Sequence, residues 1–75
     1  MTYKTLRTEW NRNLNMVEQS NQKVDLLTRC KLMGQIGYLQ GTIKTKLVHS
    51  DSEVAKMAYR ANLGQLEALA REVTA

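Results

Sequence analysis

The apolar residues of this 75-residue chain follow helical spacing in three separate segments. In the first segment they recur every three or four positions, at Tyr3, Leu6, Trp10, Leu14 and Val17. A helix places such positions on one face. The pattern predicts an amphipathic helix over residues 3–18 that carries the single tryptophan of the chain.

The middle segment, residues 22–49, contains two stripes without charge. The first, called here the bulky stripe, consists of Leu32, Ile36, Leu39, Ile43 and Leu47. The second, called here the glycine stripe, consists of Cys30, Gly34, Gly37 and Gly41. At about 100° per residue the two stripes lie on nearly opposite sides of one helix. A surface helix needs only one apolar face, so this pattern predicts a central helix packed between neighbours.

The last segment, residues 52–73, repeats the pattern of small residues. An alanine stripe of Ala61, Gly64 and Ala68 follows Met57 at spacings of four, three and four. Small residues let two helix backbones approach closely, and the added dispersion contacts offset part of the roughly 1 kcal/mol that each glycine costs relative to alanine. The two stripes therefore predict an antiparallel hairpin in which they form the contact. In the alternative interpretation the glycines only loosen the helix or end it near Gly41.

Two polar stretches separate the three segments. Ser50 precedes Glu53 by three residues, a spacing that predicts a capping box at the start of the last helix. Residues 18–22 interrupt the apolar pattern without a glycine or a proline. A loop and a polar stretch of one continuous helix both fit this second interruption.

These patterns predict one all-α domain over residues 1–75, either an antiparallel helical hairpin or a small three-helix bundle. If the first helix folds back, it covers the bulky stripe; if it stays extended, the bulky stripe needs a second subunit. A chain of this size buries only about 60% of its unfolded surface, which favours self-association. The residues expected at the partner interface are Tyr3, Leu6, Trp10, Leu14, Val17, Leu32, Ile36, Leu39, Ile43 and Leu47.

The charge distribution supports a second hypothesis. The net charge is +4, and no acidic residue lies between Asp25 and Asp51. Helical spacing groups a polar strip on one side of the middle helix, and a strip of this kind can follow a phosphate backbone or can simply face solvent. The strip is made of Lys31, Gln35, Tyr38, Thr42, Lys46 and His49. A nucleic-acid contact would use Lys31 and Lys46 together with Arg7 and Arg12.

Residues that carry catalysis or hold metals are sparse. The neighbouring His49, Ser50 and Asp51 do not predict a triad, because a triad is defined by geometry rather than by adjacency. Cys30 lies in the glycine stripe, where we expect a buried packing residue rather than a nucleophile. No Cys and His spacing fits zinc, and Gly34 to Gly41 lacks the Lys-Ser/Thr ending of a phosphate loop. We expect no enzymatic activity, no cofactor and no metal.

The sequence therefore predicts a non-enzymatic helical protein–protein interaction or assembly module that associates with itself or with another protein. The alternative is a small basic nucleic-acid-binding regulator. The longest segment without charge is far shorter than the roughly 20 residues that span a bilayer, and the N-terminus has no apolar signal-peptide core. We expect no membrane insertion, and a reducing intracellular or virion setting. Size and composition are also typical of phage accessory and virion proteins.

Overall fold

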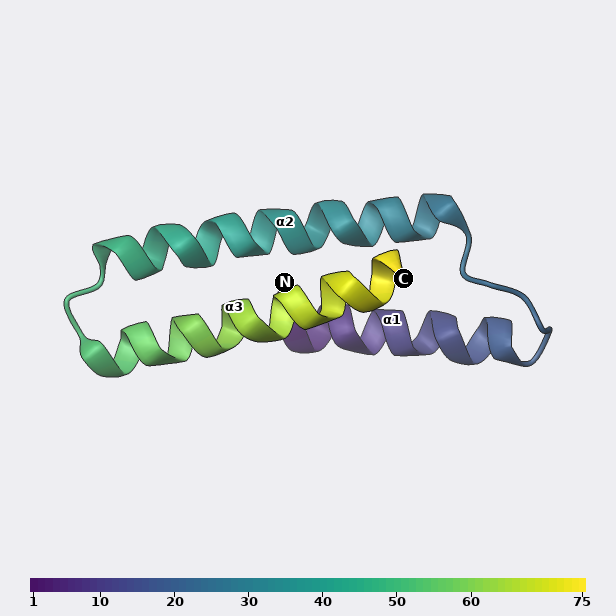
Figure 1. Ribbon diagram of the computed structural model, residues 1–75, viewed down its shortest axis with the longest axis horizontal. Helices are drawn as coiled ribbons and strands as arrows, with labels where there is room; N and C mark the ends of the chain where they lie inside the picture. Colours follow the sequence, from purple (N-terminus) through teal and green to yellow (C-terminus); the bar gives the residue numbers. More distant parts are fainter.

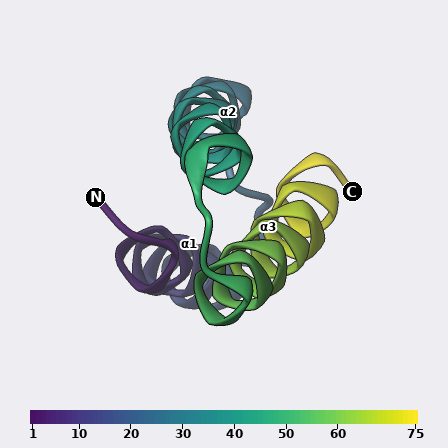
Figure 2. The same cartoon turned by 90° about the vertical axis from the view of Figure 1, so that its left-hand side faces the viewer.

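The computed structural model describes residues 1–75 as three α-helices without a strand. The helices are α1 (Tyr3–Glu18), α2 (Leu26–His49) and α3 (Glu53–Thr74). Figure 1 shows α1 and α3 on the same side of α2, both running opposite to it. Viewed along its length, the molecule places the three helices at the corners of a triangle (Figure 2). The prediction of an all-α fold is confirmed.

The three helices overlap only in the middle of an elongated molecule of 49 × 19 × 18 Å. In Figure 1, α3 starts at the α2–α3 turn, whereas α1 ends at the opposite end of α2. The N-terminus of α1 reaches only as far as Leu39 and Ile43 of α2, which line one hollow with Met1 and Tyr3. Beyond this point the molecule is a two-helix arm that ends at the α2–α3 turn.

The core consists of apolar side chains from all three helices. Leu6 and Trp10 of α1 are 1% and 3% exposed, and they belong to one cluster with Leu32 and Ile36 of α2. Burying an aliphatic or aromatic side chain contributes roughly 1.5–3 kcal/mol, so this cluster is the main source of stability. Its nine buried members are Leu6, Trp10, Val24, Leu32, Ile36, Ile43, Leu66, Leu69 and Val73.

The first helix is therefore folded back, and the side chains predicted to contact a partner pack against each other within a single molecule. Tyr3, Leu14, Val17 and Leu39 are partly buried and pack against the core cluster. Leu47 is also partly buried. The prediction that this face and the bulky stripe form a partner interface is wrong, because the two faces cover each other.

The link between α1 and α2 is a loop, which decides the question left open for residues 18–22. Asn21 has a φ of 58°, a left-handed conformation that a short polar side chain tolerates and that ends a helix. Val24 is buried and fixes the loop to the core. Asp25 then caps α2, because its carboxylate accepts a hydrogen bond from the backbone N–H of Thr28. Accordingly α2 begins at Leu26, four residues later than predicted.

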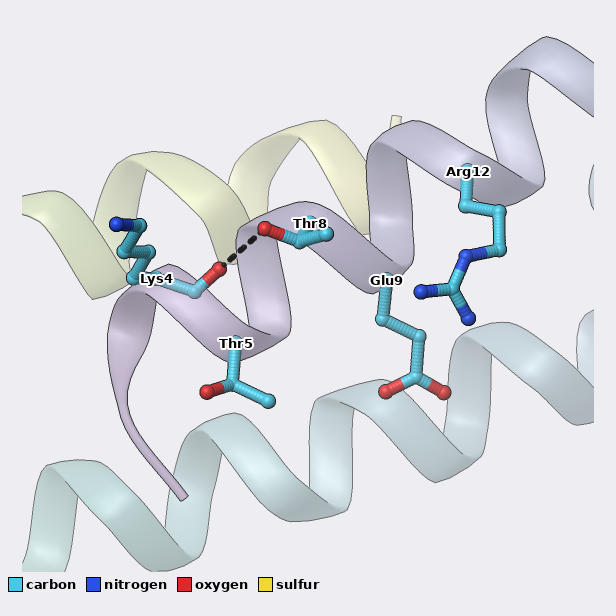
Figure 3. Close-up of a pocket in the computed structure, with 5 residues that line it drawn as sticks. All are labelled: Lys4, Thr5, Thr8, Glu9 and Arg12. Carbon is cyan, nitrogen blue, oxygen red and sulfur yellow. Dashed lines mark hydrogen bonds between the residues drawn. The ribbon is translucent and has the colours of Figure 1, made fainter.

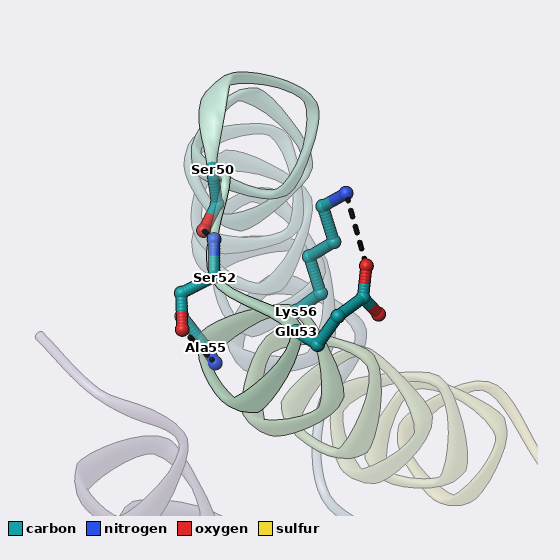
Figure 4. A network of polar contacts seen from close by, with 5 residues as sticks. All are labelled: Ser50, Ser52, Glu53, Ala55 and Lys56. Carbon is teal, nitrogen blue, oxygen red and sulfur yellow. Dashed lines mark hydrogen bonds and ion pairs between the residues drawn. The ribbon is translucent and has the colours of Figure 1, made fainter.

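The start of α3 differs from the predicted capping box. The Oγ of Ser52 accepts a hydrogen bond from the backbone N–H of Ala55 at 3.3 Å, and Ser52 is the N-cap (Figure 4). The Oγ of Ser50 instead accepts from the backbone N–H of Ser52 at 3.4 Å. Glu53 does not reach back to Ser50, because its carboxylate lies 3.6 Å from the ammonium of Lys56. The predicted pairing of Ser50 with Glu53 is wrong.

Two valines of α3 provide a matched test of the core. Val73 is 0% exposed and Val54 is 80% exposed. Val73→Ala removes two buried methyl groups and should lower the free energy of unfolding by about 2 kcal/mol, which lowers the thermal midpoint by about 10 °C. Val54→Ala should change it by less than about 0.5 kcal/mol. Thermal and urea unfolding followed by circular dichroism measures both, and equal losses would contradict the described core.

The cap of α2 gives a prediction of pH dependence. A hydrogen bond from the Thr28 hydroxyl, assisted by the Thr28 backbone N–H, holds the pKa of Asp25 below its ordinary value. Its stabilisation is therefore fully present above the unfolded pKa near 3.9 and is lost as the pH falls through the folded pKa. Asp25→Asn keeps an acceptor but does not titrate. The thermal midpoint of this variant should lie below that of the wild type at pH 7, and the difference should shrink below pH 4. A difference independent of pH would show that the carboxylate charge contributes nothing.

Candidate interaction surfaces

The glycine stripe lies on the outside of the molecule. Its four members are exposed, as are Ala61, Gly64 and Ala68 of the alanine stripe. A Cβ atom added at any of the four glycines would have no heavy atom within 4 Å. The two stripes therefore do not touch within the chain, and the prediction that Cys30, Gly34, Gly37, Gly41, Ala61, Gly64 and Ala68 join α2 to α3 is wrong.

The two helices pack through their large aliphatic side chains instead of their glycines because the aliphatic faces offer more apolar area for burial. The contact between α2 and α3 uses Leu32 and Ile36 on one side and Leu66 and Leu69 on the other, all at most 1% exposed. Each square ångström of apolar surface removed from water contributes about 25 cal/mol, so large aliphatic side chains outweigh a close backbone contact between glycines. Cys30 is exposed with the rest of its stripe, so the prediction of a buried packing cysteine is also wrong.

The side of α2 that bears the glycine stripe is apolar, yet no other part of the chain covers it. Leu26, Leu27 and Val48 are 75%, 80% and 78% exposed. Helical spacing places them on the same side as the glycine stripe, and the one charged residue on this side is Lys44 at its edge. We call this surface the outer face of α2 and define it by Leu26, Leu27, Cys30, Gly34, Gly37, Gly41 and Val48.

The outer side of α1 is different. It carries polar, exposed side chains, as a solvent-facing helix normally does. They are Lys4, Thr8, Asn11 and Asn15. Exposure alone therefore does not explain the apolar character of the outer face of α2.

The polar strip predicted on α2 lies on the side next to α1. Lys46 of this strip lines one hollow with Thr2 and Tyr3 at the start of α1. The other flank of α2 faces α3, because the Arg29 guanidinium donates a hydrogen bond to the backbone oxygen of Ala75 at 3.4 Å. The strip and α1 thus share one side of the molecule.

A second hollow on this side contains only polar side chains, and they come from α1. Its lining residues are Lys4, Thr5, Thr8, Glu9 and Arg12. Figure 3 shows Thr5 and Glu9 pointing towards α2, whereas the hydroxyl of Thr8 donates to the carbonyl oxygen of Lys4 at 2.8 Å. Lys4 and Arg12 take part in none of the three ion pairs of the structure. Lys4 was not among the residues predicted from the sequence, because its contribution depends on how α1 folds back.

Arg7 lies on the other side of α1. Its Nη1 lies 2.5 Å from a carboxylate oxygen of Glu72, and its Nε donates to the hydroxyl of Tyr3 at 3.0 Å. The hydrogen bond with Tyr3, followed by the pairing with Glu72, raises the pKa of this guanidinium against the opposing effect of burial. Arg7 thus joins α1 to α3, and its predicted role beside Arg12 in binding nucleic acid stays a prediction.

The junction between α2 and α3 shows no catalytic arrangement. His49 and Asp51 are exposed, and no hydrogen bond joins either of them to Ser50. Three or more His, Cys, Asp or Glu side chains nowhere come together as metal ligands. None of the three helices combines the length and the apolar character required to cross a bilayer.

No protein-family model, curated protein or solved structure matches this chain.

The glycine stripe generates a prediction of its own. Gly37→Ala adds a methyl group where nothing lies within 4 Å, in a helix that alanine favours by about 1 kcal/mol. The thermal midpoint of the monomer should rise by about 4–8 °C. Thermal unfolding should be measured at a concentration where light scattering gives the monomer mass. A lower midpoint would show that this face packs within the chain.

Proposed function

We propose that this chain is a non-enzymatic helical assembly module that associates with further copies of itself through the outer face of α2. The observation that supports this proposal is that neither backbone conformation nor packing within the chain requires glycine at these positions of α2. None has a left-handed φ, and none has a neighbour that a methyl group would meet. Gly34, Gly37 and Gly41 together cost about 3 kcal/mol relative to alanine, a large fraction of the stability of a small domain.

A second helix packed on this face would give the glycines a use. Without side chains between them, two helices can approach to about 8 Å, and their backbones then gain dispersion contacts along the whole stripe. Leu26 and Leu27 at one end of the face and Val48 at the other would lose their exposure to water in the same contact. This burial would add to the favourable free energy of association.

A second copy of the chain carries a suitable partner surface on α3. The exposed alanine stripe of Ala61, Gly64 and Ala68 carries only small residues, and the exposed Met57 lies at its N-terminal end. Charge favours α3 over a second α2. The basic residues Arg29, Lys31, Lys44 and Lys46 of α2 face no acidic residue in that helix, so two α2 helices repel each other. In α3 three acidic residues balance three basic ones, which are Glu53, Glu67, Glu72, Lys56, Arg60 and Arg71.

A contact of α2 with α3 of another copy is heterologous. One copy of the pair then keeps a free glycine stripe, and the other copy keeps a free alanine stripe. Further copies can bind to both, so association continues until a ring closes or a filament forms. A symmetric contact of α2 with α2 would instead stop at the dimer. The two arrangements predict different behaviour when each stripe is blocked separately.

The first test blocks the glycine stripe. Gly37→Glu places a charged side chain in the middle of the outer face of α2 but in open space for the isolated chain. Its molar mass, measured by light scattering after size exclusion, should fall from a multiple of 8.6 kDa to that of smaller species. The matched control is Asn11→Glu, which adds the same charge to the exposed polar side of α1 and should leave the mass unchanged. A wild type that stays monomeric at its highest soluble concentration would refute the proposal.

The second test identifies the partner surface by mixing. Gly37→Glu leaves the alanine stripe intact, and Gly64→Glu leaves the glycine stripe intact. If the contact joins α2 to α3, the two variants should form a one-to-one dimer when mixed and should remain monomeric separately. Dimers of Gly64→Glu alone would indicate a contact of α2 with α2 and would reject the heterologous arrangement.

A further inference from the structure

We propose that the side of the molecule formed by α1 and α2 binds the phosphate backbone of a nucleic acid. This surface is separate from the outer face of α2, so the inference does not depend on self-association. It joins the polar strip of α2, from Lys31 to Lys46, with the polar hollow of α1 that contains Lys4 and Arg12. The fold places the two next to each other, since Lys46 lines a hollow with the first residues of the chain.

The charges on this side are unbalanced. Lys4, Arg12, Lys31 and Lys46 are exposed, and none belongs to an ion pair. Glu9 is the one carboxylate in the polar hollow (Figure 3). The opposite flank of α1 is different, because there Arg7 is paired with Glu72 of α3. Folding thus uses one cation internally and leaves Arg12, Lys31 and Lys46 on the side shared by α1 and α2, with Lys4 next to them on the outer side of α1.

The length and chemistry of the strip suit a phosphate backbone. Lys31 and Lys46 are fifteen residues apart, which corresponds to about 22 Å along a helix, or roughly six base pairs at 3.4 Å per phosphate. Lysines act as point charges for phosphates, and the hydroxyl of Thr42 and the amide of Gln35 lie between them as neutral donors. Tyr38 is 72% exposed, and its hydroxyl offers a further neutral donor to a phosphate oxygen.

The same chemistry distinguishes nucleic acid from an anionic membrane. Helices that bind at a membrane surface insert large apolar side chains from the face that meets the lipid. Between Lys31 and Lys46 this strip presents Gln35, Tyr38 and Thr42 instead. None of these contacts reads a base edge in a groove, so the binding should be independent of sequence and sensitive to salt.

The test measures binding to a fluorescent random-sequence DNA duplex by anisotropy over a salt series. The wild type should bind at low salt with an affinity in the micromolar range, and log K should fall linearly with log salt concentration. Lys31→Gln combined with Lys46→Gln should reduce the slope by about two, since each phosphate contact contributes about 0.9. Glutamine keeps the helix propensity of lysine, and circular dichroism checks that the variant is folded.

The matched control removes the same charge elsewhere. Lys44 lies at the edge of the glycine stripe, away from the polar strip, and Arg60 lies on α3; both are exposed and outside every ion pair. Lys44→Gln combined with Arg60→Gln should leave the slope unchanged. Equal losses in both double variants would indicate attraction by net charge alone and would overturn the assignment of the site. Binding to phosphatidylserine vesicles but not to DNA at the same salt would overturn the choice of nucleic acid.

Discussion

The structure depends on the burial of the bulky stripe of α2. This stripe is the longest helical row of large aliphatic side chains in the sequence. Helix α3 runs beside α2 from the α2–α3 turn to Ala75 next to Arg29, and Leu6 and Trp10 of α1 join the same cluster, so that Leu32 and Ile36 lose contact with water. Once this face is turned inwards, the geometry of a helix turns the glycine stripe outwards.

Helix α1 converts a hairpin into a three-helix core. Leu6 and Trp10 supply the apolar side chains, and Arg7 sets how α1 sits on α3 through its contacts with Tyr3 and Glu72. An ion pair at the surface contributes little stability, whereas the side chains beneath it contribute several kcal/mol. The position of Arg7 nevertheless has a consequence for the surface, because it turns the flank of Arg12 towards α2. The basic side of the molecule is thus a result of the same packing that builds the core.

Periodicity predicted the helices and the two stripes of α2 because both depend on local spacing alone. It could not predict which stripe faces inwards, since a stripe of glycines and a stripe of leucines repeat with the same period. That choice depends on the apolar area offered by α1 and α3, which is a property of the whole chain. The loop near Asn21 and the cap at Ser52 also depend on local sequence. Several neighbouring polar residues could end or cap a helix at each of these sites, so spacing alone did not identify the residue that does. Leu26 and Leu27 were missed although the spacing that groups the glycine stripe also places them beside it.

The two proposed surfaces adjoin each other on α2, and this has a consequence if both are correct. In an assembly built from repeated contacts of α2 with α3, every copy presents its basic side in the same orientation relative to its neighbours. A single copy would make only a few phosphate contacts, which gives weak and salt-sensitive binding. Linked copies raise the effective concentration of the next site along a long nucleic acid, so that overall affinity can grow by orders of magnitude without any new contact. The glycines on α2 would then affect the affinity for long nucleic acids without touching them.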